Sequence, residues 1–424
     1  MRLIRSLVLV GALAALVLPA NAVEKVTVAQ LDQVLAQRAA QPHEPAKKHN
    51  SGAPDEIIDI SDGDLLQQLD QDDELIPRMA GMELTERLST PTMYRLVGKY
   101  NLGTHVQQAL EQLADRSALL KLPVSEQLPL PPPNQEEQQV MLNQSRAYVL
   151  RELSHLPNFV ADQTTTRFDD SPMTLKYFQA TTDHSGFHRV GTIQRKITFR
   201  DGKEVTDSNS GSNDTKQKGT GLESRGEFGT EAAVVLMDLQ QGTTVFDHWE
   251  QSMAGPAAVY QYSVPRESSH YEVADTCQDR VSFHDTPGYH GEIALDAKSG
   301  TILRMTLEAE SKTGAPISHV ASVIEYGVVV LGNQRSICPL RSLAFMVEEA
   351  NGCAHGNHKL QKPLAMINQT IFSNYHRFGS TATMVLDEEA KSPNLPEGAP
   401  EKAAPGGEKG LPAAPAVSGQ NRKP

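Results

Sequence analysis

The sequence is poor in aromatic residues, in cysteine and in recognisable catalytic motifs. Aromatic residues make up 5% of its 424 residues, Trp249 is the single tryptophan, and there are three cysteines. No H-E-x-x-H zinc motif, G-x-S-x-G nucleophile elbow or G-x-x-x-x-G-K-[ST] phosphate loop occurs. These absences argue against the common metalloproteases, serine esterases and nucleotide hydrolases. We therefore expect no cofactor, while a hydrolase site assembled from distant residues stays open as an alternative, because triads are recognised in space.

Basic residues are too few to balance the acidic ones. The formal net charge is −13 at pH 7. A chain this acidic repels phosphates instead of releasing their counterions, and it is not attracted to an anionic membrane surface. We expect no nucleic acid among its partners.

Long apolar runs are absent apart from one at the start of the chain. Residues 1–22 read "MRLIRSLVLVGALAALVLPANA", in which Arg2 and Arg5 precede an apolar stretch that ends in small residues. This pattern predicts a signal peptide that is cut after Ala22, and loss of its two arginines takes the net charge from −13 to −15. No second run approaches the ~20 apolar residues of a membrane span. We expect a periplasmic or secreted protein with no transmembrane segment in the mature chain.

Apolar residues at helical spacing mark residues 23–119 as a helical region. In Val23–Ala39 they are Val28, Leu31, Val34 and Leu35. Further short helices are predicted over Asp62–Leu69, Glu83–Leu88, Pro91–Val97 and Thr104–Leu113. Ser89 or Thr90 is expected to cap the helix that Pro91 opens.

A proline-rich stretch and a long helix follow. Residues 120–135, "LKLPVSEQLPLPPPNQ", predict a semi-rigid linker. Residues Glu136–Leu156 predict the longest helix of the chain, which ends before Pro157. Its expected buried stripe consists of Val140, Ala147, Leu150 and Leu153.

From Asn158 onward the apolar period changes from helical spacing to alternation. Asp201-Gly202 is a strong hairpin signal, and short turns between strands favour antiparallel pairing. The predicted strands are FVADQTTTRF, the two arms around Asp201-Gly202, AAVVLMDL (Ala232–Leu239), TTVFDHWEQS, AAVYQYSVP, HYEVAD, GEIALD, TILRMTLEAE, HVASVIEYGVVVL, LRSLAFMVEE and AMINQTIFSNYHRFGSTATMVL. We expect an α+β fold, in which a long helix packs on a curved, half-barrel-like antiparallel sheet over residues 136–390. The Pro- and Ala-rich tail, residues 391–424, is expected to be disordered.

The stretch "GYHGEIALDAKSGTILRMTLEAE" (Gly288–Glu310) predicts a β-hairpin. Ile293 and Leu295 are expected on one face, with Glu292 and Ala294 on the other. After the turn, Ile302, Arg304 and Thr306 should alternate with Leu303, Met305 and Leu307. Asp296 is placed to bond the turn backbone, and Gly300 to take a positive φ. We favour this structural explanation over an acid/base pair of Glu292 and Asp296.

Three cysteines in an exported chain predict one disulfide and one remaining thiol. An extended strand over Leu340–Glu349 would separate Cys338 from Cys353 by tens of ångströms, far beyond the span of a disulfide, about 4.4–6.8 Å between Cα atoms. We therefore favour a Cys277–Cys338 disulfide, with Cys277–Cys353 as the second choice.

The segment "CAHGNH" is the strongest candidate for a metal site. It places Cys353, His355 and His358 within one turn, and thiolate and imidazole are ligands of zinc and copper. No C-x-x-C pair accompanies them, so we favour a surface turn without metal. For His184 and His188 we likewise favour solvated side chains, and for Trp249 a core position rather than a ligand cleft.

Several segments of the β region resemble a known family. "LPNFVADQTTTRF", "RDGKE", "SRGEFGTEAAVVLMD", "YHGEIALDAKSGTILRM", "VIEYGVVVLGNQRSICPLRS" and "NYHRFGSTATMVL" are similar to segments of a family of uncharacterised exported proteins abundant in acidobacteria. In its arrangement, a helix entering a long antiparallel meander is similar to periplasmic carriers of outer-membrane lipoproteins. That second resemblance implies a sheet that curves part-way around a helix and leaves an apolar cleft.

These observations lead to three hypotheses about function. The favoured one is a non-catalytic binding or carrier module for an apolar ligand or a partner segment, with no catalytic residues. The alternatives are a hydrolase with a spatially assembled or metal site, and an envelope scaffold that binds other proteins through its short helices.

Overall fold

The computed structural model describes residues 23–40, 75–170, 173–174, 181–182, 187–200, 203–206, 222–224, 226–277, 280–350 and 363–378. The predicted signal peptide, the tail, the helix over Asp62–Leu69, His184 and the Cys353–His358 turn lie outside these ranges. The described residues form an α+β fold dominated by one ten-stranded sheet, as predicted. Among them, no helix is both long and apolar enough to cross a membrane.

The helical region has its own apolar core. It includes β1 (Glu24–Val26), α1 (Val28–Ala40), β2 (Met82–Leu84), α3 (Thr90–Tyr100) and α4 (Thr104–Arg116), and residues 75–80 are also helical. The four residues predicted to be buried in α1 are buried. Ser89 caps α3, because its hydroxyl accepts a hydrogen bond from the backbone N–H of Thr92 at 3.3 Å.

The prediction of a helix over Glu83–Leu88 is wrong. Met82–Leu84 forms strand β2, which pairs in parallel with β1. The pairing partner lies almost sixty residues earlier in the chain, and it gives the Met82–Leu84 backbone its hydrogen bonds without a helix. Met82 and Leu84 point into the core while Glu83 is exposed, so the local period is that of a strand.

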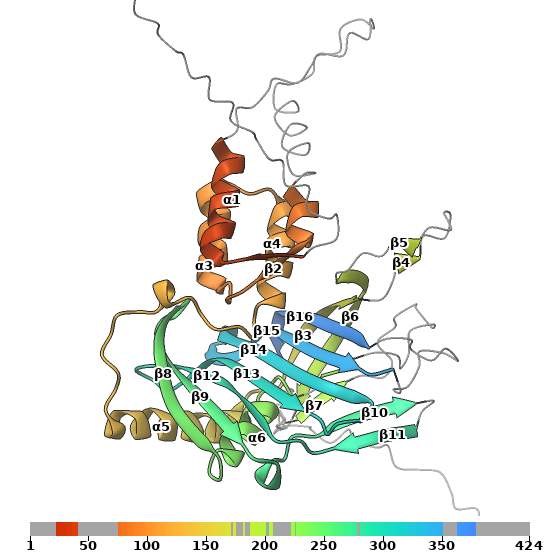
Figure 1. Cartoon of the computed structure of the whole chain (residues 1–424). Coiled ribbons are helices and arrows are strands. Elements are labelled where there is room, and N and C mark those ends of the chain that lie inside the picture. Colours follow the sequence, from red (N-terminus) through yellow and green to blue (C-terminus); the bar gives the residue numbers. More distant parts are fainter. Residues whose placement is uncertain are drawn as a thin grey trace, which may run out of the picture. The chain divides into compact units, whose positions relative to one another are not determined.

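The large sheet is antiparallel throughout. Its order is β7-β6-β3-β16-β15-β14-β13-β12-β9-β8, so it ends in two edge strands (Figure 1). The strands are β3 (Phe159–Asp169), β6 (His188–Arg200), β7 (Lys203–Thr206), β8 (Thr243–Ser252), β9 (Gly255–Val264), β12 (Tyr289–Asp296), β13 (Ile302–Glu310), β14 (Ile317–Leu331), β15 (Gln334–Glu348) and β16 (Leu364–Arg377). Two short hairpins accompany it, β4 (Met173–Thr174) with β5 (Thr181–Thr182) and β10 (Val273–Cys277) with β11 (Arg280–Asp285). The sheet curves, which confirms the predicted architecture.

Two helices cover one face of this sheet. These are α5 (Gln135–His155) and α6 (Thr230–Asp238), seen below the sheet in Figure 1. They share an apolar cluster with Tyr260, Ile293, Met305 and other sheet residues. The cluster therefore fixes which face of the sheet the helices cover.

Two expectations about these helices are wrong. The run Ala232–Leu239 was predicted as a strand, yet most of it lies in α6, where Ala232, Val235 and Leu236 are buried at helical spacing. In α5 the buried residues include Met141 and Val149, while Val140 and Leu150 of the predicted stripe are exposed. Contact with the sheet, rather than apolarity alone, selects the buried stripe.

The β12–β13 hairpin forms as predicted, with one difference. Asp296 accepts hydrogen bonds from the backbone N–H groups of Lys298 (3.1 Å) and Ser299 (2.7 Å). Gly300 has φ +68°, and a Cβ there would lie 2.7 Å from Cβ of Gln144 on α5. A bulge between Ala294 and Leu295 shifts the register of the two strands. Ile302 therefore lies on the same face as Met305, under α5, and not on the face of Arg304.

The predicted linker packs against the edge of the sheet. The backbone N–H of Leu128 donates to the carbonyl of Trp249 at 2.8 Å, and the indole N–H of Trp249 donates to the carbonyl of Pro131 at 2.9 Å. The ring of Trp249 packs against the cluster under α5. Trp249 is thus partly buried against the core, at the edge of the sheet, and not fully within the core as we favoured.

Candidate ligand-binding cavity

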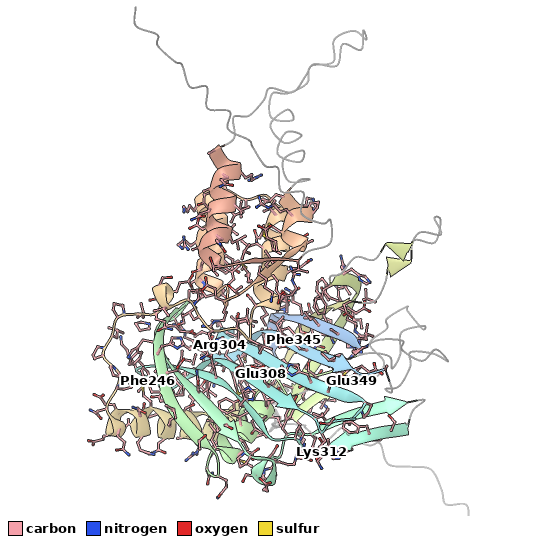
Figure 2. The ribbon with its side chains drawn as sticks, in the orientation of Figure 1. Phe246, Arg304, Glu308, Lys312, Phe345 and Glu349 are labelled. Carbon is pink, nitrogen blue, oxygen red and sulfur yellow. The ribbon has the colours of Figure 1, made fainter. Side chains whose placement is uncertain are left out.

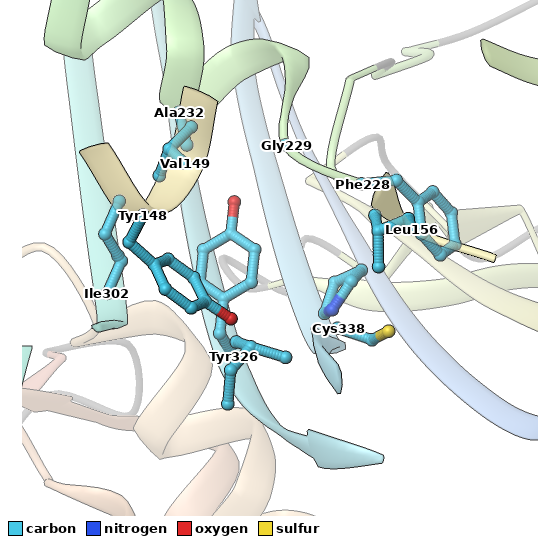
Figure 3. A pocket seen from close by; sticks show the side chains of 11 residues that line it. Tyr148, Val149, Leu156, Phe228, Gly229, Ala232, Ile302, Tyr326 and Cys338 are labelled. Carbon is cyan, nitrogen blue, oxygen red and sulfur yellow. The ribbon is translucent and has the colours of Figure 1, made fainter. Parts of the chain in front are cut away.

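A cavity lies between α5, the start of α6 and strands β13 to β15 (Figure 3). Its volume is about 40 Å³, room for a few water molecules or a short piece of an alkyl chain. Its walls are largely apolar side chains. The lining residues are Tyr148, Val149, Leu156, Phe228, Gly229, Ala232, Ile302, Tyr326, Ile337, Cys338 and Pro339.

A glycine-rich turn sets the wall that α6 contributes. Gly226 and Gly229 have φ of +99° and +118°, values that other residues rarely adopt. The turn closes with the N–H of Glu231 donating to the carbonyl of Gly226 at 3.0 Å. It places Phe228 and Ala232 beside the cavity, and Phe228 packs edge-on against Phe372 with ring centroids 5.1 Å apart.

Cys338 lies in β15 at the cavity wall as a buried free thiol. Burial in apolar surroundings raises the pKa of the thiol to about 12, so it stays protonated and unreactive. The expected Cys277–Cys338 disulfide is not formed in the structure. Our sequence argument placed Cys338 just before the strand, whereas it lies within β15 in the third apolar cluster, packed with residues such as Phe159 and Phe199.

The other face of the sheet meets the helical region through charged groups. Arg304 on β13 (Figure 2) pairs with Glu292 at 2.5 Å and lies 3.7 Å from Glu250. Arg87, which follows β2, pairs with Glu250 and lies 3.8 Å from Glu292. These residues together with Glu325 form what we call the interface charge cluster.

The pKa values within this cluster reflect the balance of burial and charge. Burial would raise the pKa of Glu250, but the charges of Arg304 and Arg87 outweigh it and lower the pKa. Burial raises the pKa of Glu325, although Arg304 and a hydrogen bond from Thr90 oppose the change. Glu250 is therefore an anion held between two guanidinium groups. This ion pairing accounts for the cluster as a structural contact between the helical region and the sheet.

A polar groove of about 410 Å³ opens beside the cluster. Leu119 and Lys121 from the end of the helical region contribute to its walls, as do His290, Glu292 and Glu308 from the sheet. Glu292 already pairs with two arginines there, so one of the two carboxylates that line the groove is committed to the interface.

Asp238 and His270 form a close acid–imidazole pair. Their Oδ1 and Nδ1 atoms are 2.6 Å apart, and Asp238 also accepts from the His270 backbone N–H at 2.9 Å. The Tyr289 hydroxyl donates to the same carboxylate at 2.8 Å. These bonds tie the His270 loop to the end of α6, which accounts for both side chains structurally.

The residues that the structure brings together at these sites were not identified from the sequence. His188 lies at the start of β6, 3.3 Å from Asp169, and the three metal candidates lie outside the described ranges. Within those ranges no group of three potential metal ligands occurs. Sequence reasoning missed Tyr326, Glu227 and Glu231, which no motif marks. All three lie in segments that carry the family resemblance, and the two glycines of "GEFGTE" also mark a turn beside Glu227 and Glu231.

Comparison with known proteins gives little further identification. No protein-family model matches the chain, and no curated protein matches it. The crystal structure of a putative outer membrane lipoprotein-sorting protein domain from Vibrio parahaemolyticus is 9% identical, with 60% of this chain and 93% of that chain covered and a TM-score of 0.23. A DUF1329 family protein from Desulfovibrio piger is 6% identical, with 56% and 92% covered and a TM-score of 0.25. At these TM-scores the likeness carries no inference about function.

Proposed function

We propose that the chain is an exported, non-catalytic binding module for an apolar ligand, held between α5 and the covered face of the sheet. The observation that carries the proposal is the cavity lined by Val149, Phe228 and Ile302. Ligand sites in proteins are concave and mostly apolar, with a few placed polar groups. The Tyr148 and Tyr326 side chains are the polar groups of this cavity.

A ligand longer than a short alkyl segment requires α5 to move, because the cavity volume is only about 40 Å³. On α5 a buried polar residue, Ser145, lies between Met141 and Val149 and interrupts the apolar stripe that packs on the sheet. By comparison with this cavity, typical ligand-binding pockets are larger, with volumes of about 300–1,000 Å³.

The experiment that tests this function starts from protein purified without detergent. Mass spectrometry after solvent extraction should find a lipid-like molecule in stoichiometric amount, and adding such molecules to stripped protein should raise the melting temperature. Ala232→Leu, which fills the cavity, should abolish the shift. Ala233→Leu, one residue further along α6 and outside the cavity lining, should retain it. Absence of any bound molecule and of any stabilising ligand would refute the proposal.

A further inference from the structure

Two buried carboxyl groups flank the wall of the cavity. Glu227 and Glu231 come from the turn that supplies Phe228 and Gly229 to the lining, and they are 2% and 8% exposed. The Ser224 hydroxyl donates to Glu227 at 2.6 Å, and the Ser322 hydroxyl donates to Glu231. In the part of the chain that the structure describes, neither carboxyl forms an ion pair with a basic side chain.

Tyr326 provides a polar group inside the cavity. Its hydroxyl oxygen is buried, and it has no hydrogen-bond partner among the described residues. A buried hydroxyl without a partner costs free energy that a bound group can recover. Burial and the neighbouring charges of Glu231 and Glu227 raise the pKa of Tyr326, so the hydroxyl remains a neutral donor and acceptor beside two acidic groups.

We propose that this cavity takes a single-chain amphiphile whose head group donates hydrogen bonds and carries no negative charge, an ammonium or a hydroxyl. This inference rests on the proposed function and names the ligand class. The alkyl chain packs against Val149, Ile302 and Ala232, while the head group reaches Tyr326 on the side of the cavity nearest the two carboxyls. A carboxylate or phosphate head is disfavoured there, because it would be buried beside two acidic groups that pair with no basic side chain among the described residues.

Matched ligands of one chain length test the inference on the full mature chain. Isothermal titration at pH 7 with dodecylammonium, dodecanol and dodecanoate, each below its aggregation limit, should show the first two binding at least about tenfold more tightly than dodecanoate, the difference expected of one buried polar interaction. Equal or tighter binding of dodecanoate overturns the ligand class while leaving the apolar site standing. Failure of all three to bind overturns the proposed function as well.

Two variants test which side chains recognise the head group of the ligand. Tyr326→Phe removes the hydroxyl without altering the ring, so dodecanol and dodecylammonium should bind about tenfold more weakly. Glu231→Gln should reduce the preference for dodecylammonium over dodecanoate. The matched control is Tyr260→Phe, since Tyr260 is buried under α5 but does not line the cavity, and binding should be unchanged. Unchanged binding in Tyr326→Phe, in a variant whose melting curve shows that it is folded, overturns the proposal.

Discussion

Arg304 on β13 and Glu292 on β12 form an ion pair diagonally across the hairpin, with Nη2 and Oε2 2.5 Å apart. Arg304 is almost fully buried and also lies near Glu250 and Glu325, so it is the positive centre of the interface charge cluster. One hairpin thus supplies apolar residues to the face under α5 and charged residues to the opposite face.

Replacing Arg304 should destabilise the protein strongly. In Arg304→Met, Glu250 and Glu292 lose a neighbouring cation in a buried site, and removing one partner of such a pair typically costs about 3–5 kcal/mol. Urea unfolding measures the loss. The control is Arg78→Met, whose partner Glu24 lies 3.6 Å away with about half of each side chain exposed. It should change the free energy of unfolding by less than about 1 kcal/mol, and comparable losses in the two variants would contradict the assignment.

Glu231 should make stability depend on pH. Burial raises its pKa from 4.5 to about 7, although the bond from Ser322 opposes the shift. The folded state then binds the proton more tightly than the unfolded state, so its stabilising contribution is full below pH 4.5 and is lost as the pH rises to about 7. The free energy of unfolding should be measured at pH 5 and at pH 8. Its change between these two values should be smaller in Glu231→Gln than in the parent protein, by roughly 2–3 kcal/mol.

Glu272→Gln serves as the comparison, because the Glu272 side chain is largely exposed. It should keep the pH response of the parent. The role given to Glu231 fails if the two variants respond alike.

Cys338 should be inert in the folded protein. Its buried thiol, with a pKa raised to about 12, should not react with iodoacetamide at pH 8, and it should react once the protein is unfolded in urea. Peptide mapping before and after unfolding measures the label. The Cys338 peptide should have the same mass before and after reduction. A disulfide-linked Cys277–Cys338 peptide would contradict the free thiol and restore the pairing that the sequence predicted.

Gly300 should be required for the contact between the hairpin and α5. Alanine there combines a positive φ of +68° with a Cβ 2.7 Å from Gln144 and 3.0 Å from the backbone nitrogen of Ser145. The left-handed backbone costs about 1–2 kcal/mol and the overlap about as much again. Gly314→Ala has the backbone cost alone, because φ is +85° and no described atom lies within 4 Å of the added Cβ. Thermal unfolding should separate the two variants, and equal losses would show that α5 yields without cost.

The strands were predictable because their apolar alternation is local. The Thr243–Ser252 strand was predicted with the bounds that the structure gives, and the turn at Asp296 and Gly300 follows from side-chain chemistry within a few residues. The run "AAVVLMD" was not predictable in this way, because six consecutive apolar residues fit a buried strand and a buried helix equally well. What makes it a helix is the Gly226–Gly229 turn and the sheet beneath it.

The cavity was less predictable than the fold. Glu231 lies on α6 and Tyr326 on β14, ninety-five positions apart, and each is an ordinary residue in its own segment. Their proximity follows from the order in which the strands pair, which no local pattern specifies. The buried stripe of α5 was also misassigned. A polar residue, Ser145, interrupts the apolar series that faces the sheet, so apolarity alone did not mark that face.

The helical region encloses one apolar cluster and the sheet encloses others, and within the described ranges no residue belongs to both. Charged and hydroxyl groups join them, through Arg87, Thr90 and the pair of Asp115 with Arg341. The helical region and the sheet thus belong to one compact unit with separate apolar cores, and we expect the charged contacts to couple their unfolding. Strong acid, which neutralises Glu250 against its lowered pKa, should let a calorimeter resolve two melting events where neutral solution gives one.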